Sequence, residues 1–244
     1  MKIGKFDYIN NYLPYYYIEK EKLAEIVTAT PKEMIELLES RKIEYAPIPS
    51  FYYLKHKDRF KRYRFCVASN GRVYSVIVVS KDGKIGKKVG ITSETTTSVN
   101  LLKIILAEKG IKCKLVPTNS FKANDILKSC DSALVIGDSA LEARKRFKVV
   151  MDLGEEWKDL TGYPMVFGIS ASIDNAEICD ELLIKSLRWG LKNFDEVVKS
   201  AVERFGIDEE FLRTYFKALK HEMDEKCEKG LKAFEEFCRD YKLL

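Results

Sequence analysis

The feature that most constrains the fold is a regular alternation of short apolar segments with amphipathic segments between residues 88 and 153. The spacing predicts strands at 88–92, 112–117, 132–136 and 149–153, and helices at 97–109, 120–129 and 141–147. Strands and helices that alternate in this way form a parallel, doubly wound sheet with helices on its faces. The fold class expected for this part of the chain is therefore α/β.

Two strongly apolar strands bracket this block, and no linker separates them from it. They lie at 74–80 and 164–172. The pattern predicts a discontinuous first α/β lobe of residues 1–81 and 165–244, with residues 82–164 inserted as a second α/β lobe. A ligand is then expected where strand ends and helix starts converge in the cleft of such a scaffold.

The flanking regions complete the first lobe. Strands are expected at 2–6 and 43–48, and a helix at 31–41, which Thr30 and Glu33 open as a capping box with Pro31 at the first helical position. After residue 172 the pattern predicts only helices, at 180–205, 209–221 and 224–241.

Composition narrows the functional classes. The chain has 244 residues, 46% of them hydrophobic and 32% charged, so a packed core is expected rather than disorder. The net charge is +5, but the charges interleave, which argues against a nucleic-acid groove and allows attraction of a small anion. No apolar segment is long enough for a signal peptide or a membrane span, so the expected location is the cytoplasm, with no membrane partner.

Several kinds of chemistry have no motif in this sequence. GxSxG, P-loop, GxGxxG and HExxH motifs are all missing, which argues against triad hydrolysis, nucleotide chemistry, nicotinamide chemistry and zinc catalysis. His56 and His221 lie in charged helical segments and are expected on the surface. The six cysteines have no metal-ligand spacing and are expected to be small buried or half-buried hydrophobic side chains. They are Cys66, Cys113, Cys130, Cys179, Cys227 and Cys238.

A hydroxyl-rich turn between a strand and a helix, at 90–99, is the strongest candidate for binding. Thr97 and Ser98 are the last two of six Ser and Thr residues within seven positions, 92–98. Unpaired N–H groups at the helix start, with these hydroxyls, suit a carboxylate or a phosphate. The alternative is that the hydroxyls only cap the helix.

A second strand-to-helix turn contains Gly137 and Asp138. Asp138 is a candidate catalytic group or a cleft-lining residue, and its alternative role is again a helix cap. Three other polar residues, Asn10, Ser50 and Ser75, lie in loops next to expected strands, and each loop by itself is ordinary.

In order along the chain, these segments resemble a known family. The motifs are Tyr-Ile-Asn before Leu-Pro, Ile-Pro-Ser, Asn-Gly-x-Val-x-Ser, Thr-Ser-x-x-x-Thr-Ser-Val, Leu-Val-Ile-Gly-Asp and Asp-Leu-Gly-Glu-Glu-Trp-x-x-x-Thr-Gly-x-Pro-x-Val-Phe. They are similar to those of the chorismate dehydratases of the futalosine route to menaquinone. The similarity runs from about residue 1 to 172 and is weaker in the helical remainder.

The resemblance implies a two-lobed fold like that of class II periplasmic binding proteins, with mixed or parallel central sheets and a helical C-terminus. The sequence departs from the family pattern at two places. One more residue than usual separates Asn10 from Leu-Pro, and Arg72 stands where Pro commonly follows Asn-Gly. Both departures lie close to the expected cleft and bear on the choice of substrate.

The resemblance also implies an activity, the loss of water from chorismate to give 3-[(1-carboxyvinyl)oxy]benzoate. Such a carbon–oxygen lyase needs no cofactor, because formation of the aromatic ring drives the step. Asn10, Ser75 and Asp138 are the expected catalytic residues. The expected substrate-binding residues are Ser50, Thr97, Ser98 and Gly137.

Three points remain open in this interpretation. The proton acceptor is either Asp138 or a carboxylate of the substrate itself. The sister enzyme 1,4-dihydroxy-6-naphthoate synthase shares the scaffold. A solute-binding or sensor protein for a small carboxylate is the alternative without chemistry, because a fold does not define a function.

Overall fold

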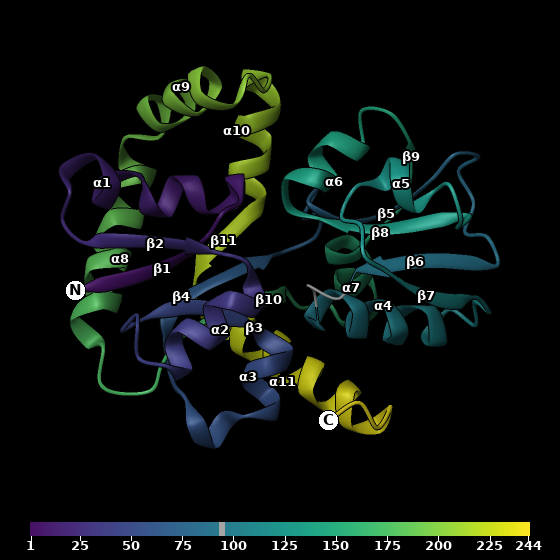
Figure 1. Cartoon of the computed structure of the whole chain (residues 1–244), viewed down its shortest axis with the longest axis horizontal. Coiled ribbons are helices and arrows are strands. Elements are labelled where there is room, and N and C mark those ends of the chain that lie inside the picture. The colour runs from purple at the N-terminus through teal and green to yellow at the C-terminus, as the bar shows by residue number, and fades with distance from the viewer. Residues whose placement is uncertain (93–95) are drawn as a thin grey trace. The chain divides into compact units, whose positions relative to one another are not determined.

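The computed structural model describes residues 1–92 and 96–244 and divides the chain into two compact α/β units (Figure 1). Unit 1 consists of Met1–Ala68 and Val166–Glu225, and unit 2 of Ser69–Met165 and Lys226–Leu244. In the part of the chain described, no helix combines the length and the apolar character that crossing a membrane requires.

Unit 1 contains two sheets. The first pairs β1 (Lys2–Phe6) with β2 (Glu25–Ala29) in parallel. The second has the order β11 (Leu219–Glu222), β4 (Lys61–Ser69), β10 (Met165–Ser172) and β3 (Ala46–Pro49), and β10 runs antiparallel to β3. A parallel bridge between Ile3 and Tyr45 connects β1 to the residue before β3.

The helices of unit 1 follow from local sequence as well as from packing. They are α1 (Tyr12–Glu21), α2 (Pro31–Glu39), α3 (Ser50–Lys55), α8 (Glu177–Lys192), α9 (Phe194–Phe205) and α10 (Glu209–Ala218). The expected capping box of α2 is confirmed: Glu33 N donates to Thr30 Oγ1 and Thr30 N donates to Glu33 Oε2. Met34 and Leu38 then turn the apolar face of α2 into the core.

Unit 2 has one five-stranded sheet with the order β7 (Lys114–Thr118), β6 (Lys88–Thr92), β8 (Ser132–Ile136), β5 (Val76–Ser80) and β9 (Lys148–Asp152). β6 is parallel to β7 and β8, whereas β5 is antiparallel to β8 and β9. The four strands β6 to β9 of the predicted block therefore run in one direction, as expected, and the sheet is mixed only because β5, expected in the first lobe, joins it antiparallel. The apolar residues Ile77, Val79 and Val135 form its buried centre.

The helices of unit 2 are α4 (Thr96–Glu108), α5 (Ala123–Ile126), α6 (Gly137–Ala143), α7 (Leu153–Thr161) and most of α11 (Glu225–Asp240). The Trp157 ring of α7 lies edge-on to Phe234 and Phe237 of α11, with centroids 5.9 and 5.6 Å away. Trp157 Nε1 also donates to the carbonyl oxygen of Pro164 at 3.2 Å. The C-terminal helix thus completes the core of unit 2.

These contacts place the boundaries between the units elsewhere than the sequence pattern suggested. β5 belongs to the sheet of unit 2, although residues 74–80 were expected in the first lobe. Residues 226–244 also belong to unit 2, because α11 packs against α7. Apolar periodicity predicted the existence of α11 but carried no information about its partner.

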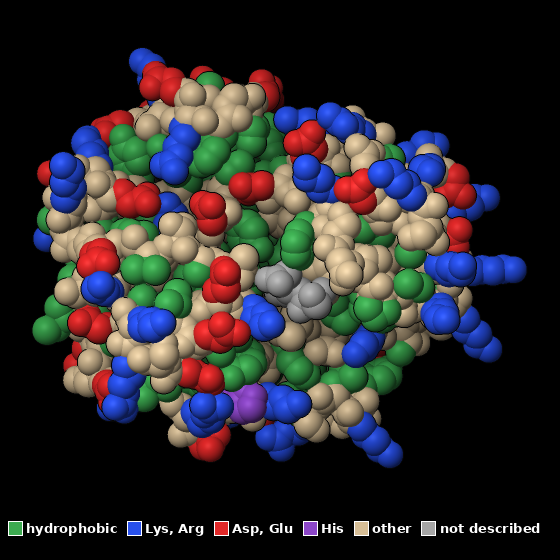
Figure 2. Space-filling view, in the orientation of Figure 1, with side chains coloured by type: hydrophobic (Ala, Val, Ile, Leu, Met, Phe, Trp, Pro, Cys, Tyr) green, Lys and Arg blue, Asp and Glu red, His purple; other side chains and the backbone are tan. Residues whose placement is uncertain are grey.

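The expectation of an all-helical segment after residue 172 is wrong at 219–222, where β11 joins β4. His221 lies on this strand and is buried, not exposed as expected. The prediction for the cysteines is confirmed, since all are buried except Cys113, which is partly buried. On the face drawn in Figure 2, Lys and Arg side chains are interspersed with Asp and Glu side chains.

Candidate functional site

The predicted site residues fall into two groups, each within one unit. Unit 1 contains Asn10 and Ser50. Unit 2 contains Ser75, Thr97, Ser98, Gly137 and Asp138. Both groups lie where strands meet the loops and helices that follow or precede them.

In unit 2, strand direction brings three segments to one edge of the sheet. The parallel strands β6 and β8 end at Thr92 and Ile136, and the antiparallel strand β5 begins at Val76. Ser75 and the start of α6 therefore share this edge with the end of β6. Helix N-termini at such an edge present N–H groups and a partial positive charge, which favour an anion.

Ser75 and Gly137 are directly connected. Gly137 N donates a 2.8 Å hydrogen bond to the carbonyl oxygen of Ser75. The Ser75 hydroxyl is buried and donates to the carbonyl oxygen of Val73 at 3.3 Å, a long hydrogen bond. Gly137 has φ +56°, a left-handed conformation that suits glycine at this strand-to-helix turn.

The hydroxyl-rich turn is described only in part. Residues 93–95 of the predicted anion-binding motif lie outside the described residues. Thr92, Thr97 and Ser98 are buried, whereas Thr96, the first residue of α4, is exposed. The two hydroxyls proposed for binding therefore face the interior at the start of a helix of 13 residues.

Asp138 differs in its surroundings from its neighbour Gly137. It is partly exposed and lines a pocket of about 420 Å³. The other polar side chains of this pocket come from α5, α6 and the residues next to them: Lys122, Asn124, Ser139, Glu142 and Arg146. Asp138 thus faces α5, while the backbone of Gly137 binds Ser75.

In unit 1, Asn10 and Ser50 follow the carboxyl ends of β1 and β3. The bridge between Ile3 and Tyr45 aligns these strands in parallel, so both ends lie at the same edge. Asn10 lies in a single 3-10 turn at Ile9–Asn11, and Ser50 is the first residue of α3.

Three side-chain oxygen atoms at this edge are buried. Asn10 Oδ1, Asn11 Oδ1 and Ser50 Oγ have no hydrogen-bond partner among the described residues. Buried polar atoms are normally paired with protein, water or ligand, so these three oxygens make this edge a candidate site for water or a polar ligand. Sequence reasoning missed Asn11, whose amide group donates to Phe6 O at 3.2 Å. Its position beside Asn10 was the available indication.

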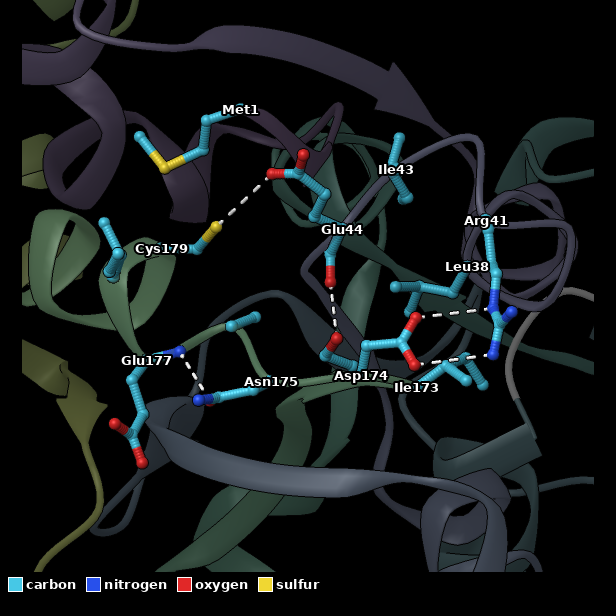
Figure 3. A pocket seen from close by; sticks show the side chains of 13 residues that line it. Met1, Leu38, Arg41, Ile43, Glu44, Ile173, Asp174, Asn175, Glu177 and Cys179 are labelled. Atoms are coloured by element: carbon cyan, nitrogen blue, oxygen red, sulfur yellow. Dashed lines mark hydrogen bonds and ion pairs between the residues drawn. The ribbon is translucent and has the colours of Figure 1, made fainter.

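A pocket of unit 1 lies at the opposite ends of these strands (Figure 3). It has a volume of about 660 Å³, and its lining includes Met1 and Glu44, which precede β1 and β3, and Asp174, which follows β10. Its polar groups contact one another: Arg41 Nη2 lies 3.4 Å from Asp174 Oδ1, and Cys179 Sγ lies 3.8 Å from Glu44 Oε2. None of the predicted site residues lines this pocket.

The whole chain matches known proteins. A family model described as menaquinone biosynthesis matches residues 1–240. A chorismate dehydratase from Thermus thermophilus is 29% identical over 249 residues, which cover 93% of this chain and 91% of that protein.

Solved structures match the fold at low sequence identity. A protein from Archaeoglobus fulgidus has a TM-score of 0.80 at 18% identity, with 100% of this chain and 98% of that chain covered. The periplasmic aliphatic sulphonate binding protein of Escherichia coli has a TM-score of 0.69 at 12% identity, with 100% and 88% covered. A ligand-binding component of an import system from Staphylococcus aureus has a TM-score of 0.70 at 14% identity, with 100% and 92% covered. The expected periplasmic-binding-protein-like fold is confirmed.

Proposed function

The chain belongs to the menaquinone-biosynthesis family, and from this membership we propose that it is a chorismate dehydratase. It converts chorismate to 3-[(1-carboxyvinyl)oxy]benzoate and water, as a carbon–oxygen lyase of the futalosine route. The observation that carries the proposal is the match to a relative of that name, which extends over 93% of this chain and so includes both units. A cytoplasmic location accords with this activity.

The reaction needs positioning more than strong reagents. The C–H bond breaks at the ring carbon that carries the enolpyruvyl ether, and its electron pair becomes a ring π bond. The neighbouring C–O bond breaks, and the leaving hydroxide takes up a proton to form water. Because the product ring is aromatic, the step requires no cofactor. The protein has to hold a dianion in one pose and stabilise the charge that develops on the leaving oxygen.

The residues proposed for binding have suitable chemistry. Thr97, Ser98 and the N-terminus of α4 hold one carboxylate of the substrate. The burial of Thr97 and Ser98 supports this role. Ser75 of unit 2 is a candidate for the second carboxylate or the departing hydroxyl, and so are Asn10 and Ser50 of unit 1. The oxygen atoms of Asn10 and Ser50 have no partner among the residues that the structure describes, and this supports the role, since a bound polar group would satisfy them.

In this proposal a carboxylate of the substrate, rather than Asp138, accepts the proton that leaves the ring carbon. Asp138 lines the pocket beside α5, whereas the Gly137 backbone is the part of this turn that binds Ser75. This difference supports a role for Gly137 at the substrate and a role for Asp138 outside proton transfer.

A binding protein is the second candidate, because several similar structures are named as binding proteins. Incubation of the purified protein with chorismate separates the candidates. A dehydratase yields a product lighter than chorismate by one water molecule, identified by chromatography and mass spectrometry. Chorismate bound tightly but recovered unchanged would favour the binding protein. Neither binding nor product would favour the sister enzyme, whose substrate is different.

A further inference from the structure

The segment before β5 contains a strained residue. Tyr74 has φ +61°, in the left-handed region, which is unfavourable for a residue with a side chain. Such a conformation persists only where the surroundings hold it. Tyr74 directly precedes Ser75, so its conformation determines the direction in which the Ser75 hydroxyl leaves the backbone.

The carboxylate of Asp152 holds this segment from one side. It accepts hydrogen bonds from Val73 N at 3.0 Å and from Tyr74 N at 2.8 Å. The same carboxylate caps α7 by accepting from Gly154 N at 3.1 Å and Glu155 N at 3.3 Å. Burial raises the pKa of Asp152 even though these N–H groups oppose the shift. One desolvated carboxylate thereby joins the start of α7 to the backbone before Ser75.

The two ends of α6 hold the same segment through its carbonyl oxygens. Arg144, the C-cap of α6, donates from Nη1 to the carbonyl oxygen of Tyr74 at 3.3 Å. Its guanidinium carbon lies 4.8 Å from the centroid of the Tyr74 ring, a cation–π contact. Gly137, the first residue of α6, donates to the next carbonyl oxygen, that of Ser75.

The backbone of residues 73–75 is therefore held from both sides. The N–H groups of Val73 and Tyr74 bind Asp152, and the Ser75 N–H binds the Val73 carbonyl oxygen at 2.7 Å. The carbonyl oxygens of Tyr74 and Ser75 bind Arg144 and Gly137. A short loop with each of these groups engaged is fixed more tightly than a surface turn needs to be.

We propose that Arg144 and Asp152 form a clamp that keeps Tyr74 left-handed and so positions the Ser75 hydroxyl for the reaction. They are positioning residues and act through Ser75. This inference rests on the proposed function, because it gives Ser75 its task there. No motif pointed to Arg144, which follows the Gly-Asp turn by six residues.

The first test compares Arg144→Ala with the wild-type protein and with Lys145→Ala. Lys145 is the exposed neighbour of Arg144, so its variant removes the same charge without touching the clamp. Arg144→Ala should lower kcat for chorismate by about tenfold to a hundredfold, the effect of a misplaced reacting group, with a smaller change in KM. Lys145→Ala should keep both constants. Arg144→Lys keeps the charge but not the planar fork, so its kcat should fall between the two.

Amide hydrogen exchange provides a readout that does not depend on activity. The amides of Val73 and Tyr74 should exchange faster in Arg144→Ala than in the wild-type protein, and the strands β6 and β8 should remain protected. Tyr74→Gly in the Arg144→Ala background should recover part of kcat, because glycine adopts positive φ without strain. A general loss of stability would not be repaired by this change.

Two outcomes would overturn the clamp: wild-type kcat in Arg144→Ala, or unchanged exchange at residues 73 and 74. Absence of wild-type turnover would instead refute the proposed function. The clamp would then be tested by comparing Arg144→Ala with the wild-type protein in two properties, the amide exchange of Val73 and Tyr74 and the affinity for chorismate. If Arg144→Ala does not fold, Arg144→Lys decides in its place: unchanged exchange and turnover in that variant would count against the clamp.

Discussion

The Nδ1 atom of His221 lies 3.3 Å from the carbonyl oxygen of Cys66, in the interior of unit 1. The imidazole ring is stacked on Phe65, with the centroids 5.7 Å apart and the planes within 3° of parallel. Burial lowers the pKa of His221 to about 4, and the contact with Cys66 only partly offsets this shift. The histidine is therefore neutral in the folded protein near neutral pH.

This burial predicts a loss of stability in mild acid. The unfolded chain binds a proton at His221 below pH about 6.5, whereas the folded protein does so only near pH 4. The contribution of His221 to stability is complete above pH 6.5 and declines by about 3 kcal/mol as the pH falls to 4. Denaturant unfolding of the wild-type protein and of His221→Phe, which keeps an aromatic ring against Phe65, should reveal this difference. Equal pH dependence in both proteins would contradict the prediction.

The predicted anion site is tested by removing its hydroxyls one at a time. Thr97→Val or Ser98→Ala should weaken chorismate binding by about 1.5–3 kcal/mol, roughly tenfold to more than a hundredfold, because each removes a donor to a carboxylate. Thr96→Val is the matched control, since Thr96 is exposed and begins the same helix. Calorimetry measures the affinities, and thermal unfolding checks the fold. Equal affinity in all three variants would mean that the motif is only a helix cap.

Asp138→Asn tests the origin of the proton acceptor. Asparagine keeps the size and hydrogen bonding of the side chain but accepts no proton at neutral pH. With a substrate carboxylate as the base, kcat in this variant should stay within a few-fold of wild type across the pH profile. A loss of about a hundredfold or more, within the range expected for removal of a general base, would assign the proton to Asp138 instead.

The packing of the C-terminal helix on unit 2 gives a stability prediction. A Cβ atom added at Gly230 would lie 2.0 Å from the carbonyl oxygen of Pro164. Gly230→Ala should therefore destabilise the protein by about 1–3 kcal/mol, although alanine is the better helix former. Lys232→Ala, at an exposed position of the same helix, should change stability by less than about 0.5 kcal/mol. A stabilised Gly230→Ala would show that α11 does not pack in this way.

The local sequence predicted the bounds of helices and strands better than it predicted which elements pair or pack together. The bounds of β1, β6 and β8 agree with the expected ranges, and α2 begins at Pro31 as its capping box predicted. β11 was missed because Leu219 is the only apolar residue of Leu219–Glu222, which lies within a charged segment with a helical pattern. Its burial depends on pairing with β4, which no local pattern expresses.

The same distinction applies to the candidate site. Loops and turns next to strands pointed to Asn10, Ser50, Ser75 and Gly137, and the directions of the strands bring these residues to one edge in each unit. Asp152 and Arg144 could not be found in this way. Their roles arise from contacts with the backbone of Tyr74 across the fold of unit 2, 78 and 70 residues away in the sequence.

The central claim is that this protein turns chorismate over, and a time course with excess substrate tests it most directly. Wild-type protein, dialysed exhaustively against a chelator, is mixed with a large molar excess of chorismate, and both substrate and product are quantified by chromatography. We predict many equivalents of 3-[(1-carboxyvinyl)oxy]benzoate per protein molecule, with equal consumption of chorismate, and a much lower rate in Ser75→Ala of unchanged thermal stability. Tight binding of chorismate with no product beyond the uncatalysed background would contradict the account and leave a binding protein.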